Sequence, residues 1–149
     1  MSSEVPAGWP RISSALFYDD APAAIDWLGR AFGFVTRLKV EGDDGSIVHS
    51  ELEYEEGLIM VGSTARGTDG RKSPRSIDGA NTQSLFIYVA DIEAHYARAK
   101  AAGAKIVAEL ETKNYGDEHW VDRGYAAVDC EGHHWWFAQR MSTSKKQTA

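Results

Sequence analysis

One group of side chains that could support acid–base or metal chemistry lies in the segment 46–54. His49, Glu51 and Glu53 are spaced two residues apart within an alternating pattern, so they share one face of a strand. An imidazole and carboxylates placed this way can bind a divalent metal together. The commoner explanation of such a pattern is a polar strand face in contact with water, and the sequence leaves both open.

A second group of candidate residues lies near the C-terminus. His119, His133 and His134 bracket the segment 120–129 and could provide another set of ligands. His133 is better explained as part of the turn over 129–132. Cys130 lies in that turn without a histidine at motif spacing, so we expect no catalytic thiol.

The pair Asp122 and Arg123 has two explanations that the sequence does not separate. The two side chains could form a structural ion pair with each other. Alternatively, the planar guanidinium of Arg123 could hold the carboxylate of a ligand.

Aromatic residues are the most abundant candidates for ligand contact, with five Trp and six Tyr. Trp135 and Trp136 are adjacent in a predicted strand, so they must point to opposite faces. We predict that Trp135 packs under a helix and that Trp136 faces a cleft, where Trp120 and Tyr115 could join it. Such a cleft is suited to stacking on a planar ligand.

The elements that must position these residues follow a pattern that occurs twice. Each copy begins with a strand, continues through Asp20 or Asp91 into an amphipathic helix, and ends that helix at Gly33 or Gly103. The hydrophobic periodicity places His95 on the exposed side of the second helix. We predict strands over 12–18, 34–40, 46–54, 58–62, 84–89, 105–110, 120–129 and 133–139.

This repetition predicts an α+β fold of two tandem βαβββ units, whose curved mixed sheets surround a cleft where the copies meet. We assign 11–63 to the first unit and 83–140 to the second, with 11–140 forming one domain. Residues 1–10 form a flexible leader and 141–149 a polar tail. The segment 64–82 is rich in glycine and basic residues and is interpreted as a linker or flap that could attract an anion.

Composition and charge argue against several classes of function and location. A net charge of −6 gives a nucleic-acid partner no electrostatic support. No apolar run approaches the ~20 residues that a membrane span needs. The N-terminus has no signal-peptide core, and the single cysteine fits a reducing compartment, so we expect a cytoplasmic protein.

Several short motifs resemble those of a known family in order and spacing. In the first unit they are 20–28 (DAPAAIDWL), 49–52 (HSEL) and 57–62 (GLIMVG). In the second they are 89–96 (VADIEAHY), 101–105 (AAGAK), 115–116 (YG), 122–125 (DRGY) and 129–137 (DCEGHHWWF), where Cys130 replaces a usual proline. The chain is thereby similar to the glyoxalase, bleomycin-resistance and extradiol-dioxygenase group, the vicinal-oxygen-chelate superfamily, over residues 11–140.

The resemblance implies a test for metal chemistry. The metal enzymes of that family carry four ligands at positions corresponding here to Ser13 (or Ser14), Met60, Leu85 and Trp136. Thioether, isobutyl and indole groups are poor ligands for divalent metals. The resemblance therefore implies a metal-poor branch, with no metal and no cofactor.

We expect a binding protein that sequesters a planar or aromatic small molecule such as an antibiotic. Relatives of this type are dimers, so a homodimer is expected. The alternative is a lyase, isomerase or dioxygenase with a divalent metal shifted to His49, Glu51 and His134; a metal-free enzyme using His49 alone would lack an identifiable partner residue. The predicted ligand-binding residues are Ser13, His49, Met60, Leu85, Tyr115, Trp120, Arg123 and Trp136.

Overall fold

The computed structural model describes residues 4–143 and contains two βαβββ units in tandem. The expected leader residues 1–3 and tail residues 144–149 lie outside the described residues. The first unit comprises β1 (Ser14–Tyr18), α1 (Ala21–Phe32), β2 (Val35–Glu41), β3 (Ile47–Tyr54) and β4 (Gly57–Ser63).

The second unit repeats this order after a connecting segment with two short 3₁₀ turns, Thr64–Arg66 and Pro74–Ser76. It comprises β5 (Leu85–Tyr88), α2 (Ile92–Ala101), β6 (Lys105–Asn114), β7 (Trp120–Val128) and β8 (His134–Thr143). The predicted α+β fold of two tandem units is confirmed.

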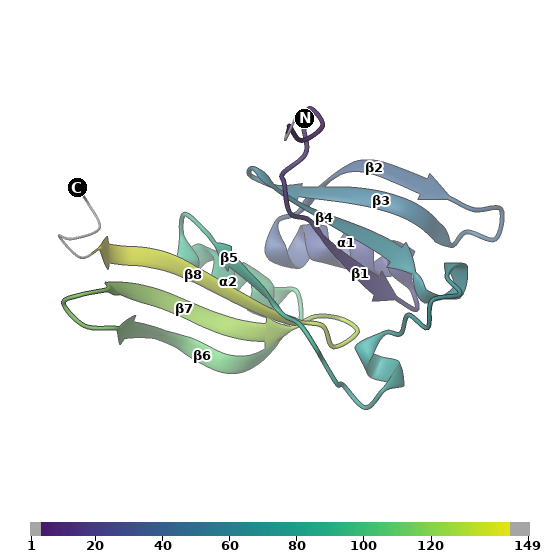
Figure 1. The fold of residues 1–149 in the computed structure, drawn as a ribbon. Coiled ribbons are helices and arrows are strands. Elements are labelled where there is room, and N and C mark those ends of the chain that lie inside the picture. Colours follow the sequence, from purple (N-terminus) through teal and green to yellow (C-terminus); the bar gives the residue numbers. More distant parts are fainter. Residues whose placement is uncertain (1–3, 144–149) are drawn as a thin grey trace.

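Each unit forms its own four-stranded mixed sheet. The strand orders are β1-β4-β3-β2 and β5-β8-β7-β6, and the first pair in each sheet is parallel. Figure 1 shows the two sheets side by side, each with its helix behind it. One face of each sheet is therefore covered by a helix, and the opposite face is left open. Strands β1 and β5 are both sheet edges.

Local sequence signals explain where the helices begin and end. The side chain of Asp20 accepts a hydrogen bond from the backbone N–H of Ala23, and Asp91 caps α2 in the same way. Helix α1 ends at Gly33, whose φ of 88° lies in the left-handed region where glycine has no steric penalty.

The hydrophobic core includes residues of both units and contains several aromatic side chains. Helices α1 and α2 pack against each other, and Phe32 of α1 contacts Trp135 and Phe137 of β8 at ring-centroid distances of 5.3 and 4.7 Å. Trp27, expected in the core, is buried and donates from Nε1 to the carbonyl oxygen of Ala102. The two repeats therefore share one hydrophobic core.

Three sequence expectations about strands need correction. Ile12, predicted within the first strand, is 86% exposed and precedes β1. The alternation predicted over 46–54 is interrupted by a β-bulge between β2 and β3, which leaves Val48 exposed and buries Ile47. Strands β6 and β8 extend beyond the predicted 110 and 139, because their pairing with β7 continues.

His95 was also placed wrongly by the helix periodicity. Its side chain is buried between the units, where Nδ1 lies 2.7 Å from the Tyr125 hydroxyl and Nε2 lies 3.0 Å from the Phe32 carbonyl oxygen. Burial lowers the pKa of His95. His95 thus lies on the buried side of α2, together with Ile92 and Ala99, and faces α1 rather than water. No helix among residues 4–143 is long and apolar enough to cross a membrane.

Candidate functional site

A hollow on the open face of the second sheet gathers most of the aromatic candidates. Strand alternation directs Trp136 onto this face and Trp135 into the core, as predicted, since Trp135 is fully buried and Trp136 is only partly buried. Phe86 pairs with Trp136 across β5 and β8 and forms another part of the wall. The hollow is lined by Phe86, Ala108, Glu109, Glu111, Lys113, Tyr115, Asp122, Gly124, Tyr125, Trp136, Phe137 and Ala138.

Small residues form the floor of this hollow. Gly124 of β7 pairs with Ala138 of β8. A Cβ atom added to Gly124 would lie 2.5 Å from the carbonyl oxygen of Phe137 and 3.1 Å from the Cβ of Ala138. Glycine at this position therefore permits the close approach of β7 and β8 under the hollow.

Charged groups border the hollow where Lys113 of β6 pairs with Asp122 of β7. Asp122 is buried and accepts hydrogen bonds from Arg140 Nε at 2.6 Å and from the Tyr88 hydroxyl at 2.9 Å. Burial, followed by the hydrogen bond to Asp122, raises the pKa of Tyr88. The Lys113 ammonium lies 5.9 Å from the centroid of the Trp136 ring and 3.5 Å from the Glu111 carboxylate. Both oxygens of Asp122 are thus used within the protein, and Lys113 is the basic group beside the Trp136 ring.

Tyr115 lines the hollow, whereas Trp120 does not. The Trp120 ring lies 6.1 Å from the Tyr115 ring, and the guanidinium of Arg140 lies 4.6 Å from the Trp120 centroid. Trp120 is thus not part of the lining of the hollow, and its ring instead contacts Tyr115 and Arg140.

Arg123 was expected either to pair with Asp122 or to hold the carboxylate of a ligand, and its contacts in the structure are with other residues of the protein. Asp122 and Arg123 point to opposite faces of β7, and Asp122 pairs with Arg140 instead. Arg123 Nε donates to Glu93 Oε1 of α2 at 2.6 Å, and its Nη1 donates to Thr112. The proposed Asp122–Arg123 ion pair is therefore wrong. Arg123 links α2 to β7 on the helix side of the sheet, away from the hollow.

No hollow among the described residues brings together all four positions carried over from the family: Ser14 and Leu85 line one groove, Trp136 lines the hollow, and Met60 lines neither. Leu85 packs against the hydrophobic core, so Phe86 occupies the open face that the alignment assigned to Leu85. Met60 lies on the first sheet, paired with Ala15 and Glu51. The Ser13 hydroxyl oxygen is buried without a hydrogen-bond partner among the described residues. These side chains are poor ligands for a divalent metal, so no metal-dependent reaction is assigned to them.

The polar face of β3 contains a compact charged cluster. His49 Nε2 lies 2.7 Å from Glu51 Oε2, and Arg37 Nε lies 2.8 Å from Glu51 Oε1. Hydrogen bonds from His49 and then Arg37 lower the pKa of Glu51. Both carboxylate oxygens of Glu51 are therefore used within the protein. Across residues 4–143, no three His, Cys, Asp or Glu side chains are arranged to hold a metal, so His134 does not join His49 and Glu51.

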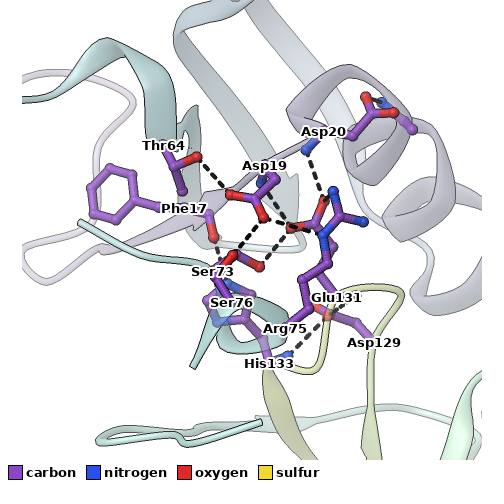
Figure 2. A network of polar contacts seen from close by, with 11 residues as sticks. Phe17, Asp19, Asp20, Thr64, Ser73, Arg75, Ser76, Asp129, Glu131 and His133 are labelled. Carbon is purple, nitrogen blue, oxygen red and sulfur yellow. Dashed lines mark hydrogen bonds and ion pairs between the residues drawn. The ribbon is translucent and has the colours of Figure 1, made fainter. Parts of the chain in front are cut away.

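The turn between β7 and β8 has a role that sequence reasoning missed. Glu131 is buried and accepts hydrogen bonds from the backbone N–H groups of Asp19 at 2.7 Å and Asp20 at 2.8 Å, and from the Ser73 hydroxyl at 2.6 Å. Arg75 lies 3.5 Å from the same carboxylate. Figure 2 shows this network joining both units and the connecting segment. The sequence feature that could have indicated this role is the pair of acidic residues, Asp129 and Glu131, on either side of Cys130 in a short turn.

The other residues of that turn are structural. Asp129 Oδ1 accepts from the backbone N–H groups of Glu131 and His133, and the ring of His133 contacts the Phe17 carbonyl oxygen at 2.8 Å. His133 therefore serves the turn, as expected. Cys130 is exposed, but desolvation at the turn and the carboxylates of Asp129 and Glu131 raise its pKa to about 12. A reactive thiolate is disfavoured at neutral pH.

Comparison with known proteins agrees with this architecture. Residues 11–137 match the Glyoxalase/Bleomycin resistance protein/Dioxygenase superfamily. Uncharacterized protein Rv0887c of Mycobacterium tuberculosis is 35% identical over 132 residues, which are 87% of this chain and 74% of that protein.

Two solved structures show the same fold. TioX from Micromonospora sp. ML1 superimposes with a TM-score of 0.68 and 32% identity, covering 87% of this chain and 98% of TioX. A glyoxalase/bleomycin resistance protein/dioxygenase from Alicyclobacillus acidocaldarius gives a TM-score of 0.60 at 13% identity, covering 87% and 90% of the two chains. The chain therefore belongs to the glyoxalase/bleomycin resistance protein/dioxygenase superfamily.

Proposed function

We propose that this protein is a metal-independent binding protein for a planar or aromatic small molecule, which stacks on Trp136 in the hollow of the second sheet. The observation that carries this proposal is the combination of a partly exposed indole, a neighbouring Phe86 on the same sheet face and a lining of small residues at Gly124 and Ala138. An offset-stacked aromatic pair contributes about 0.5–1.5 kcal/mol beyond its buried area. An antibiotic with a flat chromophore is a suitable ligand, and binding would sequester it without breaking a bond.

The hollow is small for a site that encloses a ligand, which favours a second protein surface lying over it. Its cavity volume is about 50 Å³, whereas pockets that enclose a small ligand usually measure ~300–1,000 Å³. Phe86 is 56% exposed and Tyr88 is 47% exposed on the same open face. We propose that a second copy of the chain covers this face, so that the ligand lies between two open sheet faces of a homodimer.

A fluorescence titration tests the stacking role. Bleomycin and an anthracycline serve as planar probes, and binding should quench the tryptophan emission of the intact protein. Trp136→Ala should abolish saturable quenching, and Trp136→Phe should retain it with about three- to tenfold weaker affinity, as loss of part of the stacking surface implies. Trp9→Phe is the control, because Trp9 is also partly buried and lies outside the hollow.

The same titration can overturn the proposal. If Trp136→Ala binds the probes as tightly as the unchanged protein, the stacking assignment is wrong. Metal analysis supplies a second criterion: near-stoichiometric Zn, Ni, Fe or Mn that is lost on His49→Ala would favour a metal enzyme over a binding protein.

One contact favours a second candidate function, proton transfer. Glu51 provides the hydrogen-bond partner for His49 that the sequence alone did not identify, and the His49 side chain is 38% exposed. A histidine oriented by a carboxylate is a suitable general base. Probe molecules recovered unchanged after incubation support capture, whereas conversion that His49→Ala abolishes supports an enzyme.

A further inference from the structure

A separate groove lies along the seam between the two units, and it has a cavity volume of about 190 Å³. One wall comes from the N-terminal part of β1, including Ser14 and Leu16. The opposite wall is the chain over 80–85, which leads into β5, and His134 stands at the beginning of β8. Because β1 and β5 are both edge strands, the groove runs between two sheet edges that carry unpaired backbone polar groups.

The groove has one cationic side chain and no acidic one. The chain carries a net charge of −6. The lining of the groove nevertheless contains Lys72, with His133 and His134 beside it, and it contains no Asp or Glu. A lysine without a carboxylate in the same lining favours an anion.

Lys72 differs from the other basic residues of the connecting segment. Arg66 lies 3.8 Å from Asp44, Arg71 lies 2.8 Å from Asp69, and Arg75 lies 3.2 Å from Asp19. Lys72 has no ion pair with any of the described residues, although it borders the groove. Its ammonium group is therefore available to a ligand.

The walls of the groove are held in place by hydrogen bonds across the seam. Asn81 accepts from the backbone N–H of His134 at 3.0 Å and donates to the carbonyl oxygen of Gly132 at 2.9 Å. Gln83 Nε2 donates to the Ser14 hydroxyl oxygen at 3.1 Å. These bonds tie the linker to both sheets, so the groove is preformed and a ligand need not order it.

Part of the remaining lining is apolar. Ala15, Leu16, Leu85 and Ile77 provide hydrocarbon surface beside Lys72 and the two histidines. A bare inorganic anion would leave this surface in contact with water, whereas an organic anion would cover it.

We propose that the seam groove binds a small organic anion, with a carboxylate near Lys72 and His134 and a short apolar body against Ala15, Leu16 and Leu85. This site is distinct from the hollow at Trp136 and does not depend on stacking there. It would give the connecting segment a binding role besides joining the two units.

Titration with butyrate, followed by amide signals in ¹H–¹⁵N NMR spectra, tests this proposal. Saturable shifts should concentrate on residues 80–85 and His134. Lys72→Gln should weaken butyrate binding about threefold or more, as expected for one partly exposed charge pair. Lys105→Gln is the matched control, because Lys105 is an exposed lysine on β6 outside the groove, and it should leave the affinity unchanged.

Two further probes separate charge from shape. Neutral butyramide should bind more weakly than butyrate, and inorganic phosphate should also bind more weakly because it lacks an apolar body. Equal affinities for butyrate and butyramide, stronger binding of phosphate, or equal effects of Lys72→Gln and Lys105→Gln would each overturn the proposal. Trp136→Ala should leave butyrate binding intact, so failure of the stacking site and failure of this site are distinguishable.

Discussion

The hydroxyl of Tyr18 donates a 2.6 Å hydrogen bond to the carboxylate of Asp129, and both residues are buried. Tyr18 ends β1 of the first unit, while Asp129 begins the turn between β7 and β8 of the second. Asp129 also accepts from Trp135 Nε1 at 3.0 Å. Burial, and then the nearby charge of Asp129, raises the pKa of Tyr18 well above its usual value, so the phenol remains a donor at neutral pH.

Tyr18→Phe should therefore destabilise the fold without unfolding it. The substitution removes one hydrogen bond to a charged acceptor, for which about 1.5–3 kcal/mol is expected. Urea denaturation measures this loss as a lower midpoint with an unchanged slope. Tyr115→Phe, at an exposed tyrosine, should have almost no effect. Equal midpoints for the Tyr18 variant and the unchanged protein would show that this bond does not hold the units together.

Glu131→Gln tests the network in Figure 2. An amide of the same shape offers only one acceptor oxygen to the N–H groups of Asp19 and Asp20, and it removes the charge facing Arg75. We expect a loss of about 2–4 kcal/mol, in the range for breaking a buried charged network. Thermal unfolding measures the change.

Glu56→Gln is the matched control for Glu131→Gln, because Glu56 is exposed in the turn before β4. It should leave the midpoint of thermal unfolding unchanged. A Glu131 variant as stable as this control would contradict the structural role assigned to the turn.

His95 should make stability decrease as the pH falls below about 6.5. Its pKa in the folded state is lowered from 6.5, so the unfolded chain takes up a proton first as the pH falls. The contribution of neutral His95 to the free energy of unfolding is therefore complete above pH 6.5 and declines as the pH falls toward the folded-state pKa. Denaturation at several pH values should show a shallower decline for His95→Gln, even though this variant is less stable at pH 7.5.

His119→Gln provides the control for this pH series, since His119 is exposed. It should retain the decline of the unchanged protein. If His95→Gln retained that decline as well, protonation of His95 would not be its cause. Below about pH 4, protonation of carboxyl groups with lowered pKa values, among them Asp19 and Glu51, should destabilise every variant.

Phe86→Glu should prevent self-association if a second copy covers the open face of the second sheet. The substitution places a charge where an apolar side chain is 56% exposed. Sedimentation analysis should give a dimer for the unchanged protein and a monomer for the variant, with circular dichroism confirming that the fold is retained. Met141→Glu, at a 50% exposed position outside the hollow, should remain dimeric. A monomer for the unchanged protein would refute the homodimer.

Local signals in the sequence were sufficient for the helices and for the order of the elements. Asp20, Pro22 and Gly33 act within one or two turns of α1, so their effect can be read from neighbouring residues. Alternation likewise assigned Trp135 to the core and Trp136 to the open face, because the side-chain period of a strand is a local property.

Contacts between distant segments could not be read in this way. Leu85, which was predicted to contact a ligand, packs against the core, and the adjacent Phe86 lies on the open face beside Trp136, because the parallel pairing of β5 with β8 sets their orientation. Arg123 pairs with Glu93 across α2 and β7, and His95 is buried because α1 packs against its helix.

The sequence by itself thus determined the doubled βαβββ unit, the helix caps and the faces of the two adjacent tryptophans. Only the tertiary structure decided that Glu131 joins both units and that Lys72 borders a groove without carboxylates. The physical reason is range: caps and alternation depend on residues a few positions apart, whereas Glu131 meets Asp19 across 112 positions only after both units have folded together.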